Sequence, residues 1–578
     1  MATRNGPVHV VTTSRRYKGK LYQTHLLRRS YREGSRVRNE TVGNLSHLPD
    51  HVIELIRGSL RGEVYAPTKD LFEIVSSSHH GHVHAVRSAM KRLDFDQLMA
   101  SRPSRERDLV VGMVAARVLA PHSKLATTRW WQTTTLAEDL GIKEATEGEL
   151  YKAMDWLLEH QKPIEKKLAR RHLHRGDLAL FDLTSSYFEG VCCPLAALGH
   201  NRDGKKGLLQ VNYGLLTDRD GCPVSVSVYP GNTGDPATLL PEVRKIREEF
   251  GLQSLVLVGD RGMISQKQIL QMRDLEDLAW ITALKAGQIR KLLEGGAIQL
   301  GLFDERNLVE IRHPEYPGER LMVCRNPLMV ERRVRTRQSL LEATEKELAK
   351  VQSMVSRGRL KGKAKIGLRV GKVINRYKVA KHFELEIRDD GFEYQISPAK
   401  VAAEAALDGL YVIRTNVSAE RLDASDTVRS YKSLSHVERA FRCMKTVDLK
   451  VRPIHHHLEG RVRAHIFLCM LAYYVEWHML AAWRELLFAD EDQEAKRSRD
   501  PVAPAERSVR AQRKVSRPKL DEGTGAHSFR TLLEDLRSIV RNVCRRRQGR
   551  KDEGTFQVMT TPNPQQQRAF DLLEKIAV

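Results

Sequence analysis

Residues 178–190 read LALFDLTSSYFEG, and this stretch decides how the rest of the chain is interpreted. It opens with a short apolar run, Leu178 to Leu183, that carries one carboxylate, Asp182. An ionised Asp in a buried strand is costly unless a cation, a metal ion or a cluster of hydrogen-bond donors compensates it. The pattern therefore predicts that Asp182 is placed for chemistry and has partners elsewhere in the chain.

Two downstream carboxylates are the candidate partners of Asp182. Asp260 ends the apolar run SLVLVGD, and Glu438 lies in the predicted amphipathic helix YKSLSHVERAFRCMK, residues 431–445. Two strand-borne Asp and one helix-borne Glu suit a hard oxygen site for Mg²⁺ or Mn²⁺. Each has a structural alternative, because Ser435 and Glu438 fit a capping box and Asp260 fits a strand-end turn.

Other acidic residues are assigned structural roles because they lie in turn contexts: Asp177, Asp203 and Asp218. The helix stripe beside Glu438 is expected to be buried, since its members recur at i, i+3, i+4 and i+7: Val437, Ala440, Phe441 and Met444.

The composition favours a polyanionic partner. The 578 residues include 96 Lys and Arg against 72 Asp and Glu, a net charge of +24, which suits nucleic acid or an anionic membrane surface. No apolar run approaches the roughly 18 residues of a membrane span, and the N-terminal sequence lacks the order of a signal peptide. Nucleic acid is thus the expected partner, no membrane is expected, and the cytoplasm is the expected location.

The seven cysteines predict no disulfide framework and no zinc site. Their number is odd and the chain has no C-x-x-C motif. Reduced buried thiols are the expected state.

The order of strands and helices after residue 176 predicts an α/β fold. Three antiparallel strands are followed by helix, strand, helix and strand, which is the order of a ribonuclease-H-like core. The expected division of the chain is a β meander at 1–65, a helical part that reads DNA ends at 66–175, a catalytic core at 176–289 and 408–488, a basic, mainly β insertion at 290–407, and a basic C-terminal tail of charged linker and helices at 489–578. A plain helical bundle is the alternative for the helical part.

The insertion concentrates positive charge. Residues 331–381 contain 16 Lys and Arg against 4 Asp and Glu, a net charge of +12. A solvated helix accounts for part of this charge, and a positive ribbon along DNA accounts better for its concentration.

Three motifs carry a resemblance to a known family. FDLT at 181–184, VGDRGM at 258–263 and the stretch 431–445 resemble the motifs of DDE transposases of bacterial insertion sequences, in the insertion-sequence-four-like group. Tyr431, Glu438 and Lys445 match the spacing of that group's Y-(2)-R-(3)-E-(6)-K signature, whereas Leu434 stands where the signature has Arg. The resemblance covers about residues 178–480.

The resemblance implies a mechanism. Asp182, Asp260 and Glu438 would hold two Mg²⁺ ions about 4 Å apart, with Mn²⁺ also accepted. Hydrolysis at the terminal inverted repeats of the insertion sequence would free a 3′-OH, which the same site would join to target DNA. The DNA-binding candidates are Tyr431, Lys445, Arg261 and Arg442. The resemblance also implies double-stranded DNA as the partner, a location at the nucleoid, and a homodimer that brings two ends together.

Two other functions remain as alternatives. One is a non-catalytic DNA-binding protein, a decayed or domesticated copy, which the Leu434 departure favours. The other is a metal-dependent endonuclease that never joins strands.

Overall fold

The structure is a computed structural model that divides into two compact units. It describes residues 6–577 apart from 64, 66–71, 191, 206, 274, 276, 304–305, 491–498, 504–505, 521–522 and 547–553. One unit comprises Met1–Ser77 and Arg541–Met559, and the other comprises Ser78–Val540 and Thr560–Val578.

The first unit holds two small antiparallel sheets. One is the N-terminal meander, in which a tight turn at Lys18 and Gly19, both with positive φ, joins the first two strands. Its elements are β1 (Val8–Tyr17), β2 (Lys20–Glu33), β3 (Arg36–Asn44) and the helix α1 (Asp50–Leu60). The other sheet has the order β16-β15-β4, from β4 (Phe72–His79), β15 (Val540–Arg546) and β16 (Phe556–Met559).

The second sheet corrects two predictions. Residues 72–79 lie in the stretch predicted to be helical, and residues 540–546 lie in the C-terminal tail that was predicted to consist of charged linker and helices. The physical reason is long-range pairing, since β15 pairs residue by residue with β16 from Arg541 to Cys544. The β-branched Val540 and Val543 suit a strand.

The second unit is built on a mixed eight-stranded sheet of order β10-β11-β14-β9-β8-β5-β6-β7. Strands β5, β6 and β7 are antiparallel, β8 and β9 run parallel to β5, and β14, β11 and β10 add antiparallel strands beyond β9. The strands are β5 (Leu178–Tyr187), β6 (Gln210–Asp218), β7 (Pro223–Pro230), β8 (Leu255–Val258), β9 (Leu278–Ala283), β10 (Leu308–Ile311), β11 (Arg320–Arg325) and β14 (Leu410–Thr415).

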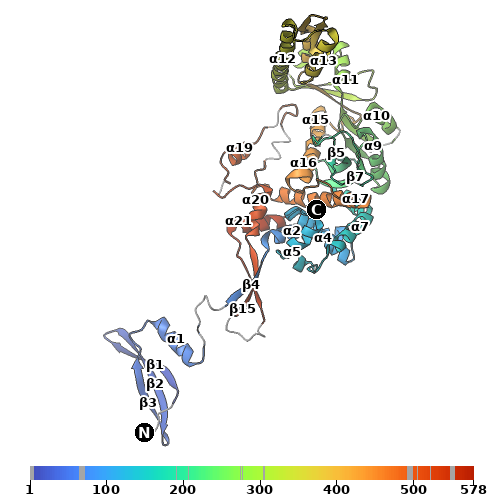
Figure 1. The fold of residues 1–578 in the computed structure, drawn as a ribbon. Coiled ribbons are helices and arrows are strands. Elements are labelled where there is room, and N and C mark those ends of the chain that lie inside the picture. The colour runs from blue at the N-terminus through green and yellow to red at the C-terminus, as the bar shows by residue number, and fades with distance from the viewer. Residues whose placement is uncertain are drawn as a thin grey trace. The chain divides into compact units, whose positions relative to one another are not determined.

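Helices cover both faces of this sheet, so β6 and β8 are buried at nearly every position. Figure 1 shows α9 and α10 flanking the sheet on the side away from α15 and α16. The helices are α9 (Asp235–Arg244), α10 (Gln266–Arg273), α15 (Ala424–Lys432), α16 (Leu434–Arg442) and α17 (Glu459–Ala482). Helix α17 packs on β7, and α16 packs on β5.

A layer of helices N-terminal to the sheet packs on α17. Ser104, Ser123 and Thr146 cap three of these helices, and Thr146 forms a capping box with Glu149. Helices α4 and α7 make the main contacts with α17. The set is α2 (Gly81–Arg92), α3 (Phe95–Met99), α4 (Arg105–Leu119), α5 (Lys124–Trp131), α6 (Leu136–Asp139), α7 (Glu147–Glu159) and α8 (Gln161–His172).

In the described part of the chain, no single helix has the length and apolar character of a membrane span; only the bent pair α4 and α5, at 90° to each other, meets that test together.

The prediction of a mainly β insertion at 290–407 is wrong. Strands β10 and β11 belong to the central sheet, and most of the remainder is helical. Part of the stretch 331–381, which was interpreted as a positive ribbon, forms the helix α13. Its Ile366 and Val370, one helical turn apart, are buried against α12. The elements are α11 (Ala286–Glu294), α12 (Pro327–Ser356), α13 (Lys363–Ile374), β12 (Phe383–Ile387), β13 (Phe392–Ile396) and α14 (Pro398–Ala405).

The C-terminal region is not simply a basic tail. Helices α20 (Phe529–Arg537) and α21 (Pro564–Glu574) pack on α2 and bury apolar side chains there. Apolar residues such as Leu532 and Leu573 attach this region to the main core. Helix α19 (Val509–Ser516) precedes them, and much of the predicted linker, 491–498 included, lies outside the described residues.

Candidate metal-binding active site

Asp182 and Asp260 lie on adjacent parallel strands. The register pairs Leu180 with Val258, and each Asp follows two residues later in its own strand direction. Parallel strands bring such positions to the same edge of a sheet. Asp182 is half-buried on β5, and Asp260 is exposed just beyond the end of β8.

Glu438 reaches the same place from a helix. Its neighbours Val437 and Phe441 are buried as the stripe predicted, and α16 packs on β5. Glu438 itself is exposed. The capping-box alternative is wrong, because Ser433 occupies the N-cap and makes no side-chain capping hydrogen bond.

All three carboxylates line one cavity of about 590 Å³. Their oxygens are not all within 4.8 Å of one another, so they border an open site instead of a closed cage. The further lining residues include Arg202, Asp203, Asp235, Tyr431, Leu434, Arg442, Lys445 and Arg452.

The surroundings of Asp182 favour a bound cation beside its carboxylate. Burial raises its pKa to about 7, and the charges of Asp260 and Glu438 act in the same direction. The backbone N–H of Leu183, which donates to Asp182 Oδ1 at 2.8 Å, and the charge of Arg202 oppose this shift. Because a divalent cation favours the ionised carboxylate and accepts oxygen ligands, Mg²⁺ or Mn²⁺ fits this donor set.

Tyr431 is held directly at the site. Its hydroxyl donates a hydrogen bond to Asp260 Oδ1 at 3.2 Å. Burial raises the pKa of this hydroxyl, and Asp260 adds to the shift. Tyr431 therefore stays a neutral donor.

Lys445 points at an aspartate that sequence reasoning treated as structural. Its Nζ lies 3.0 Å from Asp203 Oδ1, and Arg452 pairs with the same oxygen. The backbone N–H of Tyr187 donates to Asp203 Oδ2 at 3.1 Å. Burial lowers the pKa of Lys445, and Asp203 counteracts that effect. Asp203 thus orients two cations along the cavity wall.

The other two DNA-binding candidates are exposed cations. Arg442 lines the cavity from α16, and Arg261 follows Asp260 directly.

Arg202 and Asp235 were not identified as site residues from the sequence. Both line the cavity, where they form an ion pair with 2.5 Å between Arg202 Nη2 and Asp235 Oδ1. Arg202 lies in an irregular loop with no periodicity to mark it, although the charge-rich run HNRDGKKG directly before β6 was a usable signal.

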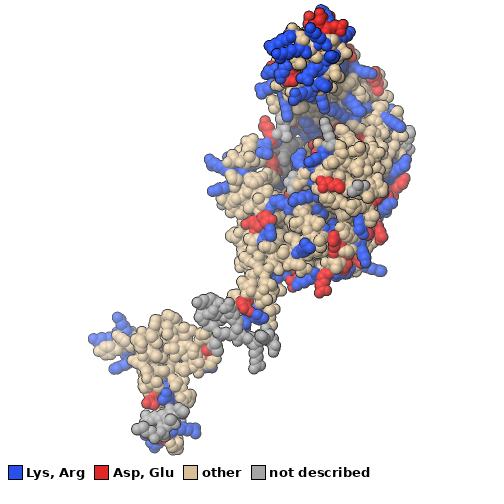
Figure 2. All heavy atoms as spheres, in the orientation of Figure 1, with Lys and Arg blue, Asp and Glu red and all other residues tan. Residues whose placement is uncertain are grey.

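Positive charge gathers over α12 and α13, as Figure 2 shows. Exposed cations run from the end of α12 through α13: Arg357, Arg359, Lys361, Lys363, Lys365, Arg369, Lys372, Arg376 and Lys378. This segment has its own apolar core, which includes Leu348, Val351 and Phe383.

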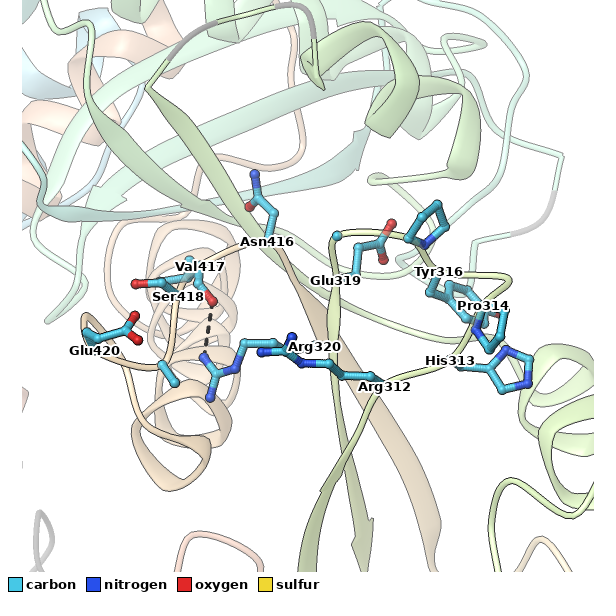
Figure 3. A pocket seen from close by; sticks show the side chains of 13 residues that line it. Arg312, His313, Pro314, Tyr316, Glu319, Arg320, Asn416, Val417, Ser418 and Glu420 are labelled. Atoms are coloured by element: carbon cyan, nitrogen blue, oxygen red, sulfur yellow. Dashed lines mark hydrogen bonds between the residues drawn. The ribbon is translucent and has the colours of Figure 1, made fainter.

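A second cavity, of about 500 Å³, lies between residues 312–320 and 416–420 (Figure 3). Its buried charges are paired, because Glu319 binds Arg414 and Arg320 binds Glu310. Arg320 also donates to the carbonyl oxygen of Val417 at 3.1 Å. Because of these pairings, we assign structural roles to Glu319 and Arg320.

Two family models match parts of the chain. Residues 191–475, a range that includes Asp260 and Glu438 but not Asp182, match the transposase DDE domain family. Residues 10–66 match the N-terminal domain of IS1634 family transposases.

No curated protein matches the chain significantly. The cryo-EM structure of a piggyBac transposase synaptic complex with hairpin DNA is similar to 78% of this chain over 77% of its own chain, with a TM-score of 0.33 and 8% identity. A likeness at this level gives no residue-by-residue correspondence.

Proposed function

We propose that this protein is a transposase that binds the terminal inverted repeats of its own insertion sequence, hydrolyses phosphodiester bonds at those ends with Mg²⁺, and joins the freed 3′-OH to target DNA. The observation that carries the proposal is the cavity shared by Asp182, Asp260 and Glu438. The strand arrangement β7-β6-β5-β8-β9, with β8 and β9 parallel to β5, supports a ribonuclease-H-like core.

The three carboxylates bind the divalent ion, with Mn²⁺ as an accepted substitute. Mg²⁺ held by these carboxylates would supply Lewis-acid charge and lower the pKa of a bound water. Asp182 contributes from the sheet and Glu438 from the helix, so their separation is fixed by the packing of α16 on β5. Tyr431 keeps Asp260 oriented through its 3.2 Å hydrogen bond.

The cations around the cavity bind the DNA backbone. Arg442 and Arg261 are exposed and free to contact phosphates, and Lys445 is oriented by Asp203. The basic segment over α12 and α13 extends this contact surface. Joining requires two DNA ends together, so the working form is a homodimer on DNA.

The test uses the full chain, DNA carrying the element's ends, and Mg²⁺ or EDTA, analysed on a sequencing gel. The proposal expects metal-dependent nicks at two matching inverted ends, followed by strand-transfer products. Asp182→Asn should abolish both and leave end binding largely intact, because the uncharged isostere loses the metal and little else. Nicks without joined products would indicate a nuclease, and binding without nicks in Mg²⁺ or Mn²⁺ would indicate a non-catalytic DNA-binding protein.

A further inference from the structure

A second group of metal-ligand side chains lies away from the carboxylates. His172 ends α8, Cys222 follows the turn between β6 and β7, and His478 lies in the last turns of α17. Cys222 Sγ lies 3.8 Å from His478 Nε2 and 4.0 Å from His172 Nε2. Three elements remote in sequence therefore direct one sulfur and two imidazole nitrogens at a common point.

The distances between the sulfur and the two imidazole nitrogens suit a metal ion with tetrahedral coordination. Zn–S and Zn–N bonds of about 2.3 and 2.0 Å at a tetrahedral angle place sulfur and nitrogen roughly 3.5 Å apart. The observed distances exceed that value by only a few tenths of an ångström, and all ligand atoms lie within 4.8 Å of one another. Small side-chain rotations would close the site.

A cavity gives access to this group. Its volume is about 450 Å³, and His172 and His478 both line it. A water from this cavity can take a fourth coordination position. Cys222 is fully buried, and its backbone N–H donates to Asp218 Oδ1 at 2.9 Å, which fixes the turn that carries the sulfur.

Two features oppose a cation here. Arg171 and Lys575 line the same cavity, and His172 Nε2 lies 3.1 Å from the Tyr474 hydroxyl. Arg171 is engaged elsewhere, since it donates to the Leu93 carbonyl oxygen at 2.7 Å. A thiolate offsets the positive charge, because Cys222 gives up its proton to solvent when its sulfur binds metal.

We propose that His172, Cys222 and His478 form a zinc site with one open coordination position, which also ties α8, the β6–β7 turn and α17 together. The mixture of thiolate and imidazole ligands favours Zn²⁺ over Mg²⁺, which prefers oxygen. The site is thus chemically distinct from the carboxylate cavity. The alternative is a thiol that only hydrogen-bonds to imidazole.

The first experiment measures the metal content of the full chain. The protein is incubated with Zn²⁺, dialysed against metal-free buffer and analysed by inductively coupled plasma mass spectrometry. The proposal expects one zinc per chain, lost in Cys222→Ser and His478→Gln. Cys324→Ser, a buried thiol on β11, and Asp182→Asn should keep it, so this result is separable from failure of the transposase mechanism.

The second experiment remains informative if the variants do not fold. Co²⁺ added to the metal-free wild-type chain should give intense visible absorption of tetrahedral Co²⁺ and a near-ultraviolet thiolate charge-transfer band. Chelation of zinc should lower the melting temperature of the wild-type chain. Absence of zinc and of both Co²⁺ bands in the folded wild-type chain would overturn the proposal, as would full zinc content in Cys222→Ser.

Discussion

Leu434 is the residue at which this chain departs from the signature that it otherwise resembles. It lines the carboxylate cavity and is 9% exposed. Leu434→Arg would add a cation beside Arg442, so we expect tighter DNA binding and a salt slope steeper by about 0.9, the value of one added phosphate contact. Fluorescence anisotropy across a salt series measures this slope.

The matched control is Leu434→Met, which should leave the slope unchanged. If Leu434→Arg behaves like Leu434→Met, the cavity wall at this position does not face the DNA backbone.

Asp203 gives a second prediction, because its nearly buried carboxylate compensates both Lys445 and Arg452. Asp203→Asn leaves these two cations without their partner, so the free energy of unfolding should fall by on the order of 3 kcal/mol. Urea unfolding measures it. The exposed turn residue Asp390 supplies the control, since Asp390→Asn should change stability by less than about 0.5 kcal/mol. If Asp203→Asn and Asp390→Asn change the free energy of unfolding equally, Asp203 does not hold Lys445 and Arg452 in place.

Residue chemistry allowed part of the site to be predicted. Asp182, Asp260 and Glu438 stand out because each interrupts or borders an apolar pattern, and the structure brings them to one cavity. Arg202 and Asp203 could not be predicted in the same way. They lie in a loop, where no periodicity reports which side chain turns inward.

The third motif shows the limit of prediction at the level of single elements. Residues 431–445 were expected to form one helix, but the structure divides them among α15, α16 and a π-helical turn, Cys443–Val447. Ser433 separates α15 from α16, and its hydroxyl donates to the Arg429 carbonyl oxygen at 3.1 Å. The break and the π turn set where Tyr431 and Lys445 point, and a simple helical period contains neither feature.

The exposed cations of α13 and its preceding turn test the proposed contact surface. Replacing Lys361, Lys363, Lys365 and Arg369 by Gln should lower the salt slope of DNA affinity by up to about 3.6, because each phosphate contact contributes roughly 0.9. The measurement is binding affinity across a salt series.

Four exposed cations on other elements supply the control: Arg244, Lys267, Arg290 and Lys291. Their replacement by Gln should lower the slope much less. Equal changes from both sets would mean that net charge, and not α13, governs the salt dependence.

At the level of the whole molecule, local sequence patterns predicted the first strands of the central sheet. They did not predict how many further strands the sheet contains. Strands β5 to β9 follow from apolar runs and turns. The addition of β11 beside β14 depends on pairing between segments far apart in sequence, which no local pattern specifies. The pairing of β15 with β16 replaced a predicted helix for a similar reason.

The division into two units gives a prediction for the whole chain. Among the described residues, those before Phe72 contribute no strand to the central sheet. Their deletion should therefore leave the main calorimetric unfolding transition within a few degrees of its original temperature. Loss of that transition would show that the second unit needs the N-terminal meander to fold.

The central claim is that Asp182, Asp260 and Glu438 together hold a divalent ion. Anomalous X-ray scattering from crystals of the protein with Mn²⁺ tests it most directly. The account predicts an anomalous peak within coordination distance of all three carboxylates in the wild-type protein, and none there in Asp182→Asn. A wild-type crystal with Mn²⁺ bound only elsewhere, or with equal peaks in both proteins, would contradict it.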